Sequence, residues 1–113
     1  MLIVDDHEDF RTSARSLLEA EGFDVVGEAA DGGQAIAEAE RLQPDIVLLD
    51  IQLPDLDGFA VAERLASTSD PPVVILISSR DATAYGPRVG KARARGFIPK
   101  SELSGAALAG LVA

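Results

Sequence analysis

The 113-residue sequence contains no cysteine and no tryptophan, and only one tyrosine, one methionine and four phenylalanines. The lack of cysteine excludes disulfides, thiolate nucleophiles and cysteine-ligated zinc or iron–sulfur sites. Because 47% of the residues are hydrophobic but only 4% are aromatic, we expect an aliphatic core. No apolar run approaches the roughly 20 residues of a membrane span, and no basic region precedes the first apolar residues as in a secretory signal. We therefore expect a folded domain in the cytoplasm, away from the membrane.

Basic residues are also scarce, since 10 Lys and Arg stand against 19 Asp and Glu, for a formal net charge of -9. Contacts to nucleic-acid phosphates need basic charge, so we expect no direct nucleic-acid binding by this domain. The charge is uneven: residues 1–79 hold 17 acids and four bases, and residues 80–113 hold two acids and six bases. No Pro- or Ser-rich linker separates the two parts. The sequence thus predicts one domain over residues 1–113 with a polarised surface.

Short β-branched runs alternate with stretches of helical spacing five times along the chain. The third and fourth runs are continuously apolar, which is typical of strands covered on both faces of a parallel sheet. The alternation predicts an α/β fold, a doubly wound five-stranded parallel sheet with helices on both faces. The predicted strands are Leu2–Val4, Asp24–Val26, Asp45–Leu49, Val73–Ile77 and Phe97–Ile98, and the predicted helices are Phe10–Glu21, Ala35–Leu42, Phe59–Leu65, Pro87–Ala94 and Leu103–Val112.

Polar residues that can carry chemistry follow four of the five predicted strands. In a doubly wound sheet the carboxyl ends of the strands meet at one edge, where ligands bind. Three carboxylates brought together there repel each other unless a cation lies among them. Oxygen ligands of this kind suit Mg²⁺ or Mn²⁺, and such a site can receive a phosphoryl group on one carboxylate. The residues at these strand ends are Asp5 and Asp6, Asp50, Ser78 with Ser79, and Lys100.

This pattern resembles the receiver domain of two-component response regulators over essentially the whole chain. The matching segments are Ile3–His7, Val47–Phe59, Ser78–Ser79 and Gly96–Lys100. The resemblance implies the flavodoxin-like strand order 2-1-3-4-5. It also implies a signalling switch rather than an enzyme, although such a domain assists its own phosphotransfer and dephosphorylation.

The resemblance implies a role for each acidic residue of the predicted site. Asp50 would accept a phosphoryl group from a partner sensor histidine kinase. Asp5 and Asp6, together with Asp50 and the backbone carbonyl of Gln52, would hold Mg²⁺ (or Mn²⁺). The side chain of Gln52 would then be free to vary.

Three further residues acquire roles in the same way. Lys100 would pair with the phosphoryl oxygens through its flexible ammonium. Ser78 would hydrogen-bond the phosphoryl group, and its spacing to Asp50 and Lys100 favours it over Ser79. Phe97 would be the aromatic side chain that changes rotamer on phosphorylation, although a plain core position stays open for it.

Other residues near the predicted site have structural interpretations. Pro54–Gly58 is a turn in which Gly58 serves a positive φ or a close backbone approach, and Asp57 caps the next helix. His7, the only histidine, is interpreted as a local hydrogen-bonding residue rather than a ligand. The basic residues of the second part are interpreted as a solvated face; they are Arg88, Lys91, Arg93 and Arg95.

Several partners and alternatives stay open from the sequence. The kinase is expected to dock on the first helix near Phe10, Ala14 and Leu17. Phosphorylation is expected to alter the face formed by the fourth helix, the fifth strand and the last helix, which is also a possible homodimer surface. The output is either a downstream protein or a DNA-binding domain beyond Ala113. Alternative functions are a phosphorylation-independent interaction module and a phosphohydrolase, but the latter would need an acid where Gln52 stands.

Overall fold

A computed structural model of the chain describes residues 1–112 and contains one five-stranded parallel sheet. The strand order is β2-β1-β3-β4-β5, which confirms the predicted doubly wound, flavodoxin-like arrangement. None of the helices over residues 1–112 is long and apolar enough to cross a membrane. The strands are β1 (Leu2–Val4), β2 (Gly27–Ala29), β3 (Ile46–Asp50), β4 (Val73–Ser78) and β5 (Gly96–Pro99), and the helices are α1 (Glu8–Ala20), α2 (Gly32–Leu42), α3 (Gly58–Ala66), α4 (Arg88–Lys91) and α5 (Gly105–Val112).

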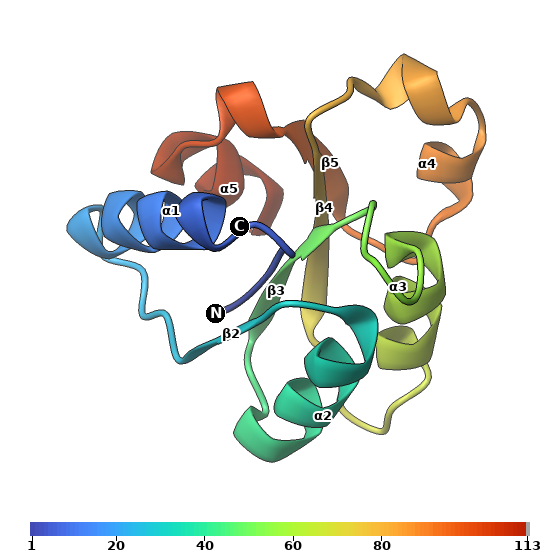
Figure 1. Cartoon of the computed structure of the whole chain (residues 1–113), viewed down its shortest axis with the longest axis horizontal. Helices are drawn as coiled ribbons and strands as arrows, with labels where there is room; N and C mark the ends of the chain where they lie inside the picture. Colours follow the sequence, from blue (N-terminus) through green and yellow to red (C-terminus); the bar gives the residue numbers. More distant parts are fainter. Residues whose placement is uncertain (113) are drawn as a thin grey trace.

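The sheet separates two aliphatic cores, as the sequence predicts for strands covered on both faces. Helices α1 and α5 lie on one face, and α2, α3 and α4 lie on the other (Figure 1). Successive residues of a strand point to opposite faces. Accordingly, Leu2 and Val4 pack in the core under α2 and α3, whereas Ile3 packs in the core under α1 and α5.

The second strand is Gly27–Ala29, so the predicted strand Asp24–Val26 is wrong by three residues. Val26 is 43% exposed in spite of its β-branched side chain. The central residue of the real strand, Glu28, is paired with Arg11 at 3.0 Å and with Arg15 at 2.7 Å, both from α1. These ion pairs allow a charged residue to occupy the edge strand, and the local hydrophobic pattern does not reveal them.

The segment before β5 also differs from the prediction of one helix over Pro87–Ala94. It forms a 3-10 turn at Ala82–Tyr85, then the four-residue helix α4. Gly86 separates the two pieces with a φ of 60°, a backbone conformation that glycine adopts readily. The short α4 leaves a surface of turns rather than a long helix on this side of the sheet.

The last helix begins at Gly105, two residues after the predicted start at Leu103. Lys100–Glu102 forms a 3-10 turn that ends β5. The Ser104 hydroxyl then accepts a hydrogen bond from the Ala107 N–H at 3.0 Å, which is the geometry of a helix N-cap. This cap fixes the point at which α5 starts.

Candidate functional site

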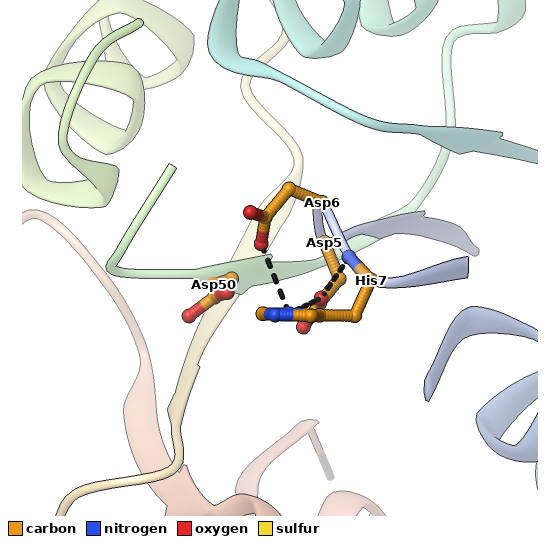
Figure 2. A group of neighbouring side chains, drawn as sticks. All are labelled: Asp5, Asp6, His7 and Asp50. Atoms are coloured by element: carbon orange, nitrogen blue, oxygen red, sulfur yellow. Dashed lines mark hydrogen bonds and ion pairs between the residues drawn. The ribbon is translucent and has the colours of Figure 1, made fainter. Parts of the chain in front are cut away.

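Three acidic side chains meet at the carboxyl edge of the sheet, as the sequence predicts. Val4 pairs with Leu49 in the β1–β3 register, so Asp5, just beyond β1, and Asp50, the last residue of β3, end neighbouring strands. Each of Asp5, Asp6 and Asp50, with His7, offers one potential ligand atom, and these atoms all lie within 4.8 Å of one another. Figure 2 shows the four side chains gathered at one place.

Burial distinguishes the members of this acidic cluster. Asp5 is fully buried and Asp50 is 3% exposed, whereas Asp6 lies toward the solvent. Buried carboxylates need hydrogen-bond donors. Asp5 Oδ1 accepts from the backbone N–H of His7 at 2.8 Å, and Asp50 Oδ1 accepts from the backbone N–H of Gln52 at 3.2 Å.

Lys100 places its ammonium between the two buried carboxylates. Its Nζ lies 2.5 Å from Asp5 Oδ2 and 3.4 Å from Asp50 Oδ2, and 4.5 Å from the centre of the Phe10 ring. Burial lowers the pKa of Lys100, but the hydrogen bonds and charges of Asp5 and Asp50 outweigh it, so the pKa is raised overall. The ammonium is therefore charged at neutral pH.

Burial raises the pKa of Asp50 to about 6; the nearby charge of Lys100 opposes this rise and that of Asp5 adds to it. The carboxylate is thus costly to ionise in this place. The cluster holds three acids, and the one ammonium beside it contacts two of them, Asp5 and Asp50. The cluster therefore has room for a further positive charge.

The residues present fit a divalent cation. Asp5 Oδ2 is buried, and among residues 1–112 it is paired with Lys100, whose ammonium is shared with Asp50. Carboxylate oxygens are the ligands that Mg²⁺ prefers. Gln52 lies beside the cluster, where its backbone forms an isolated bridge with Asp57 and its side chain is exposed. The role of its carbonyl as a ligand stays a prediction.

Ser78 is the last residue of β4 and is fully buried, opposite Pro99 of β5, whereas Ser79 is exposed. This placement favours Ser78 as the hydroxyl that faces the site. Its Oγ accepts a hydrogen bond from the Arg80 N–H at 3.1 Å and is also hydrogen-bonded to the hydroxyl of Tyr85.

Tyr85 is a site neighbour that the sequence analysis missed. Its ring packs edge-on between Phe59 and Phe97, with centroid distances of 5.8 and 6.3 Å. It thereby links the Ser78 hydroxyl to Phe97, which is half-buried on β5. No motif marks Tyr85, and the only signal available was that it is the single tyrosine of the chain.

The loop after β3 is held in place by its own acids and by one glycine. Asp57 Oδ1 accepts from the Ala60 N–H at 2.8 Å, which confirms the predicted cap of α3. A Cβ on Gly58 would lie 2.5 Å from the Asp50 carbonyl oxygen, which confirms that the backbone approaches closely there. Asp55 accepts from the backbone N–H groups at the start of α2, so the loop is tied to a second helix.

Arg11 is another residue that sequence reasoning missed. Its Nη1 donates to the Asp5 carbonyl oxygen at 2.7 Å, and its Nε donates to Glu28 at 3.0 Å. The backbone that presents Asp5 is therefore fixed from α1. Of the predicted kinase-docking residues on the same helix, Ala14 is buried in the core, whereas Leu17 is exposed.

A separate cavity of about 510 Å³ lies at the other edge of the sheet, between the last turns of α2 and α3. Its lining includes Glu40, Arg64 and Asp70 but none of the predicted site residues. The acidic cluster lies instead at the carboxyl ends of the strands. The cavity therefore plays no part in the chemistry predicted for the cluster.

A doubly wound sheet that presents a buried aspartate, two further acids, a hydroxyl and an ammonium at its carboxyl edge defines a receiver-type site. The sequence model of the response regulator receiver domain matches residues 1–109. The chain therefore belongs to the response regulator receiver family, whose members are signalling switches of two-component systems.

Individual relatives agree with this assignment. The chain is 33% identical over 101 residues to the DNA-binding transcriptional activator EvgA of Escherichia coli K12, covering 89% of the chain and 50% of EvgA. It is 37% identical over 102 residues to the virulence-factor transcription regulator BvgA of Bordetella pertussis, covering 90% of the chain and 49% of BvgA. The chain thus spans about half the length of these curated relatives, both of which are named as transcription regulators.

Solved structures are similar over nearly the whole chain. The signal receiver domain of the response regulator NarL from Mycobacterium tuberculosis superposes with a TM-score of 0.85 at 35% identity, covering 97% of this chain and 93% of that one. A LuxR-family response regulator from Aurantimonas gives a TM-score of 0.84 at 30% identity, covering 96% and 78%. These similarities support the same family and fold.

Proposed function

We propose that this domain is a phosphoacceptor switch in the cytoplasm, phosphorylated on Asp50 by a partner histidine kinase with Mg²⁺. The observation that carries the proposal is the environment of Asp50. Its carboxylate ends a buried strand, lies 3.4 Å from Lys100, and shares an edge of the sheet with two further acids.

The transfer would form a bond between one Asp50 oxygen and phosphorus while the bond from phosphorus to the donor imidazole nitrogen breaks. The bonding electron pair stays on that nitrogen. Asp5, Asp6 and Asp50, with the Gln52 carbonyl, would hold Mg²⁺, which supplies neutralising charge to the phosphoryl oxygens when bound. Lys100 contributes a second positive charge beside Asp50, and phosphoryl transfer depends mainly on such positioning and neutralisation.

The conformational change on phosphorylation would be transmitted from Ser78 to the surface through Tyr85. A phosphoryl group on Asp50 draws the Ser78 hydroxyl toward its oxygens, and this movement breaks the hydrogen bond to Tyr85. The released Tyr85 and its neighbour Phe97 would then repack beneath α4. We propose that the altered α4–β5–α5 face reports the change to a DNA-binding output domain, to another protein, or to a second copy of the chain.

Tyr85→Phe is expected to favour the phosphorylated form. The variant keeps the aromatic contacts but removes the hydrogen bond that holds Ser78 away from the phosphoryl group. One such bond contributes about 0.5–1.5 kcal/mol, so the phosphorylated fraction at limiting acetyl phosphate should rise about two- to ten-fold. Intact-mass analysis measures this fraction, with Ser79→Ala as the matched control. A fraction equal to or below that of the wild type would contradict the proposed route through Tyr85.

The proposal as a whole is tested by incubating the purified chain with acetyl phosphate and Mg²⁺. We expect an acid- and base-sensitive adduct of about 80 Da, the mass of one phosphoryl group. The adduct should be absent from Asp50→Asn and present in Asp55→Asn, whose carboxylate accepts hydrogen bonds from the backbone N–H groups of Gly32, Gly33 and Leu56. No adduct with any donor would favour the phosphorylation-independent interaction module. Multiple turnover of a phosphate ester would instead favour a phosphohydrolase, even though Gln52 is not an acid.

A further inference from the structure

Arg11 lies in the first turn of α1 and reaches the backbone of the acidic cluster. Its Nη1 donates to the Asp5 carbonyl oxygen at 2.7 Å, and its side chain is only 15% exposed. A positive charge in the first turn is disfavoured by the helix dipole, so this placement depends on other contacts. The guanidinium is held against the end of β1 rather than free in the solvent.

Glu28, the central residue of β2, holds this guanidinium in place. Its Oε1 accepts from Arg11 Nε at 3.0 Å, and its Oε2 accepts from Arg15 Nη1 at 2.7 Å. Burial raises the pKa of Glu28, but the hydrogen bonds from Arg15 and Arg11 outweigh it, so the pKa is lowered overall. Because the guanidinium is a rigid plane, the bond from Nε to Glu28 also fixes the direction in which Nη1 points.

The contact with Arg11 bears on two acids of the cluster. The backbone N–H of Asp5 donates to the Ala29 carbonyl oxygen at 3.0 Å, so with Arg11 both backbone polar groups of Asp5 are held. The Asp5 carbonyl and the Asp6 N–H belong to one planar peptide group, so the same hydrogen bond orients the start of Asp6. Side chains that share a site must be held to within about 0.5 Å, and a shift of this peptide would displace two of them.

Arg15, one turn further along α1, makes the same kinds of contact away from the cluster. It pairs with Glu28, and its Nη2 donates to the Val25 carbonyl oxygen at 3.0 Å. It also lies 3.6 Å from Glu19 and is 38% exposed. The two arginines thus differ in which backbone carbonyl they hold, and the carbonyl held by Arg11 belongs to the acidic cluster.

We propose that Arg11 is a positioning residue of the phosphoacceptor site. Oriented by Glu28, it fixes the backbone of Asp5 and Asp6 so that their carboxylates are prearranged for Mg²⁺. The inference rests on the proposed function, because it concerns the same site. It goes beyond that function by assigning a role to a pair of residues on α1 and β2 that contacts the backbone of the cluster rather than its carboxylates.

Titration of ¹⁵N-labelled protein with Mg²⁺, followed by amide resonances, tests the proposal without phosphorylation. Loss of a residue that supports metal ligands costs about ten-fold in affinity or more, so the dissociation constant for Mg²⁺ should rise about ten-fold in Arg11→Gln. Arg15→Gln, which removes the matched contacts, should stay close to the wild type. Loss of a positive charge beside acids by itself strengthens cation binding, so an unchanged or lower dissociation constant in Arg11→Gln would overturn the proposal.

The metal-free protein offers a second readout. The Asp5 carbonyl ¹³C resonance should move upfield in Arg11→Gln, which lacks the hydrogen bond to this oxygen, and should not move in Arg15→Gln. Equal changes in the two variants would mean that Arg11 only stabilises the fold. If Arg11→Gln does not fold, Arg11→Lys and Arg15→Lys provide the same comparison, because lysine keeps the charge but lacks the planar fork.

The inference and the proposed function fail in different ways. A wild-type chain that takes up a phosphoryl group with Mg²⁺, while the Arg11 and Arg15 variants bind Mg²⁺ equally well, would overturn the role of Arg11 alone. A wild-type chain that neither binds Mg²⁺ nor takes up a phosphoryl group would overturn both.

Discussion

At pH 7.5 without divalent ions, the free energy of unfolding of Lys100→Met should be about 3 kcal/mol lower than that of the wild type. The substitution leaves buried carboxylates without their positively charged partner. The Lys100 ammonium lies 2.5 Å from Asp5 Oδ2 and 3.4 Å from Asp50 Oδ2, and both acids are buried. Methionine keeps an unbranched stem of similar length but removes the charge. Urea denaturation with and without Mg²⁺ measures the effect.

The matched control for this substitution is Lys91→Met, which removes an exposed ammonium from α4. Surface changes of this kind stay within about 0.5 kcal/mol. Mg²⁺ should recover part of the lost stability in Lys100→Met, because it neutralises the same carboxylates. A loss no larger than that of Lys91→Met would mean that Lys100 does not hold the acidic cluster together.

Asp50→Asn should have the opposite effect and stabilise the metal-free protein at neutral pH. Burial raises the pKa of Asp50 from 3.8 to about 6, so ionisation of this group works against folding. The contribution of Asp50 to stability is full below pH 4 and is lost as the pH rises through about 6. Each unit of difference between the folded and unfolded pKa corresponds to about 1.36 kcal/mol. The free energy of unfolding of the variant should therefore exceed that of the wild type by up to about 3 kcal/mol at pH 7.5. Lys100 keeps Asp5 as its partner in the variant.

Denaturation at a series of pH values between 4 and 8 checks this sign. The stability difference between Asp50→Asn and the wild type should be near zero at pH 4 and reach its full value above pH 7. Asp45→Asn, which removes an exposed carboxylate near the other end of β3, should show no such trend. An Asp50→Asn protein that is less stable than the wild type at pH 7.5 would contradict the strained, buried state of Asp50.

The order of the elements could be predicted from the sequence because each central strand carries its own pattern. The apolar runs that became β3 and β4 are unbroken, and only a sheet covered on both faces accommodates such runs. The edge strand β2 could not be placed in this way. Its centre is Glu28, whose ion pairs with Arg11 and Arg15 come from another part of the chain. The interruption of the predicted helix at Gly86 could likewise not be predicted, since a positive φ depends on the surrounding contacts.

The site was predictable to the extent that topology brings strand ends together. Asp5, Asp50 and Lys100 are 45 to 95 residues apart in the sequence, yet they meet because each lies at the carboxyl end of a parallel strand of one sheet. Tyr85 lies on a turn rather than at a strand end, so no such rule locates it. His7 was assigned a hydrogen-bonding role, and its contacts with Asp5 and Asp6 agree with that assignment.

The central claim is that Asp50 itself is the reactive acid of the cluster. Borohydride reduces an acyl phosphate to an alcohol, so a phosphorylated aspartate becomes homoserine and can be located by peptide sequencing. The tryptic peptide 42–64 holds Asp45, Asp50, Asp55 and Asp57, which provides internal comparisons. After acetyl phosphate and Mg²⁺ treatment, we predict homoserine at position 50 alone. Homoserine at another position, or an unmodified peptide from a sample that carries the adduct, would contradict the account.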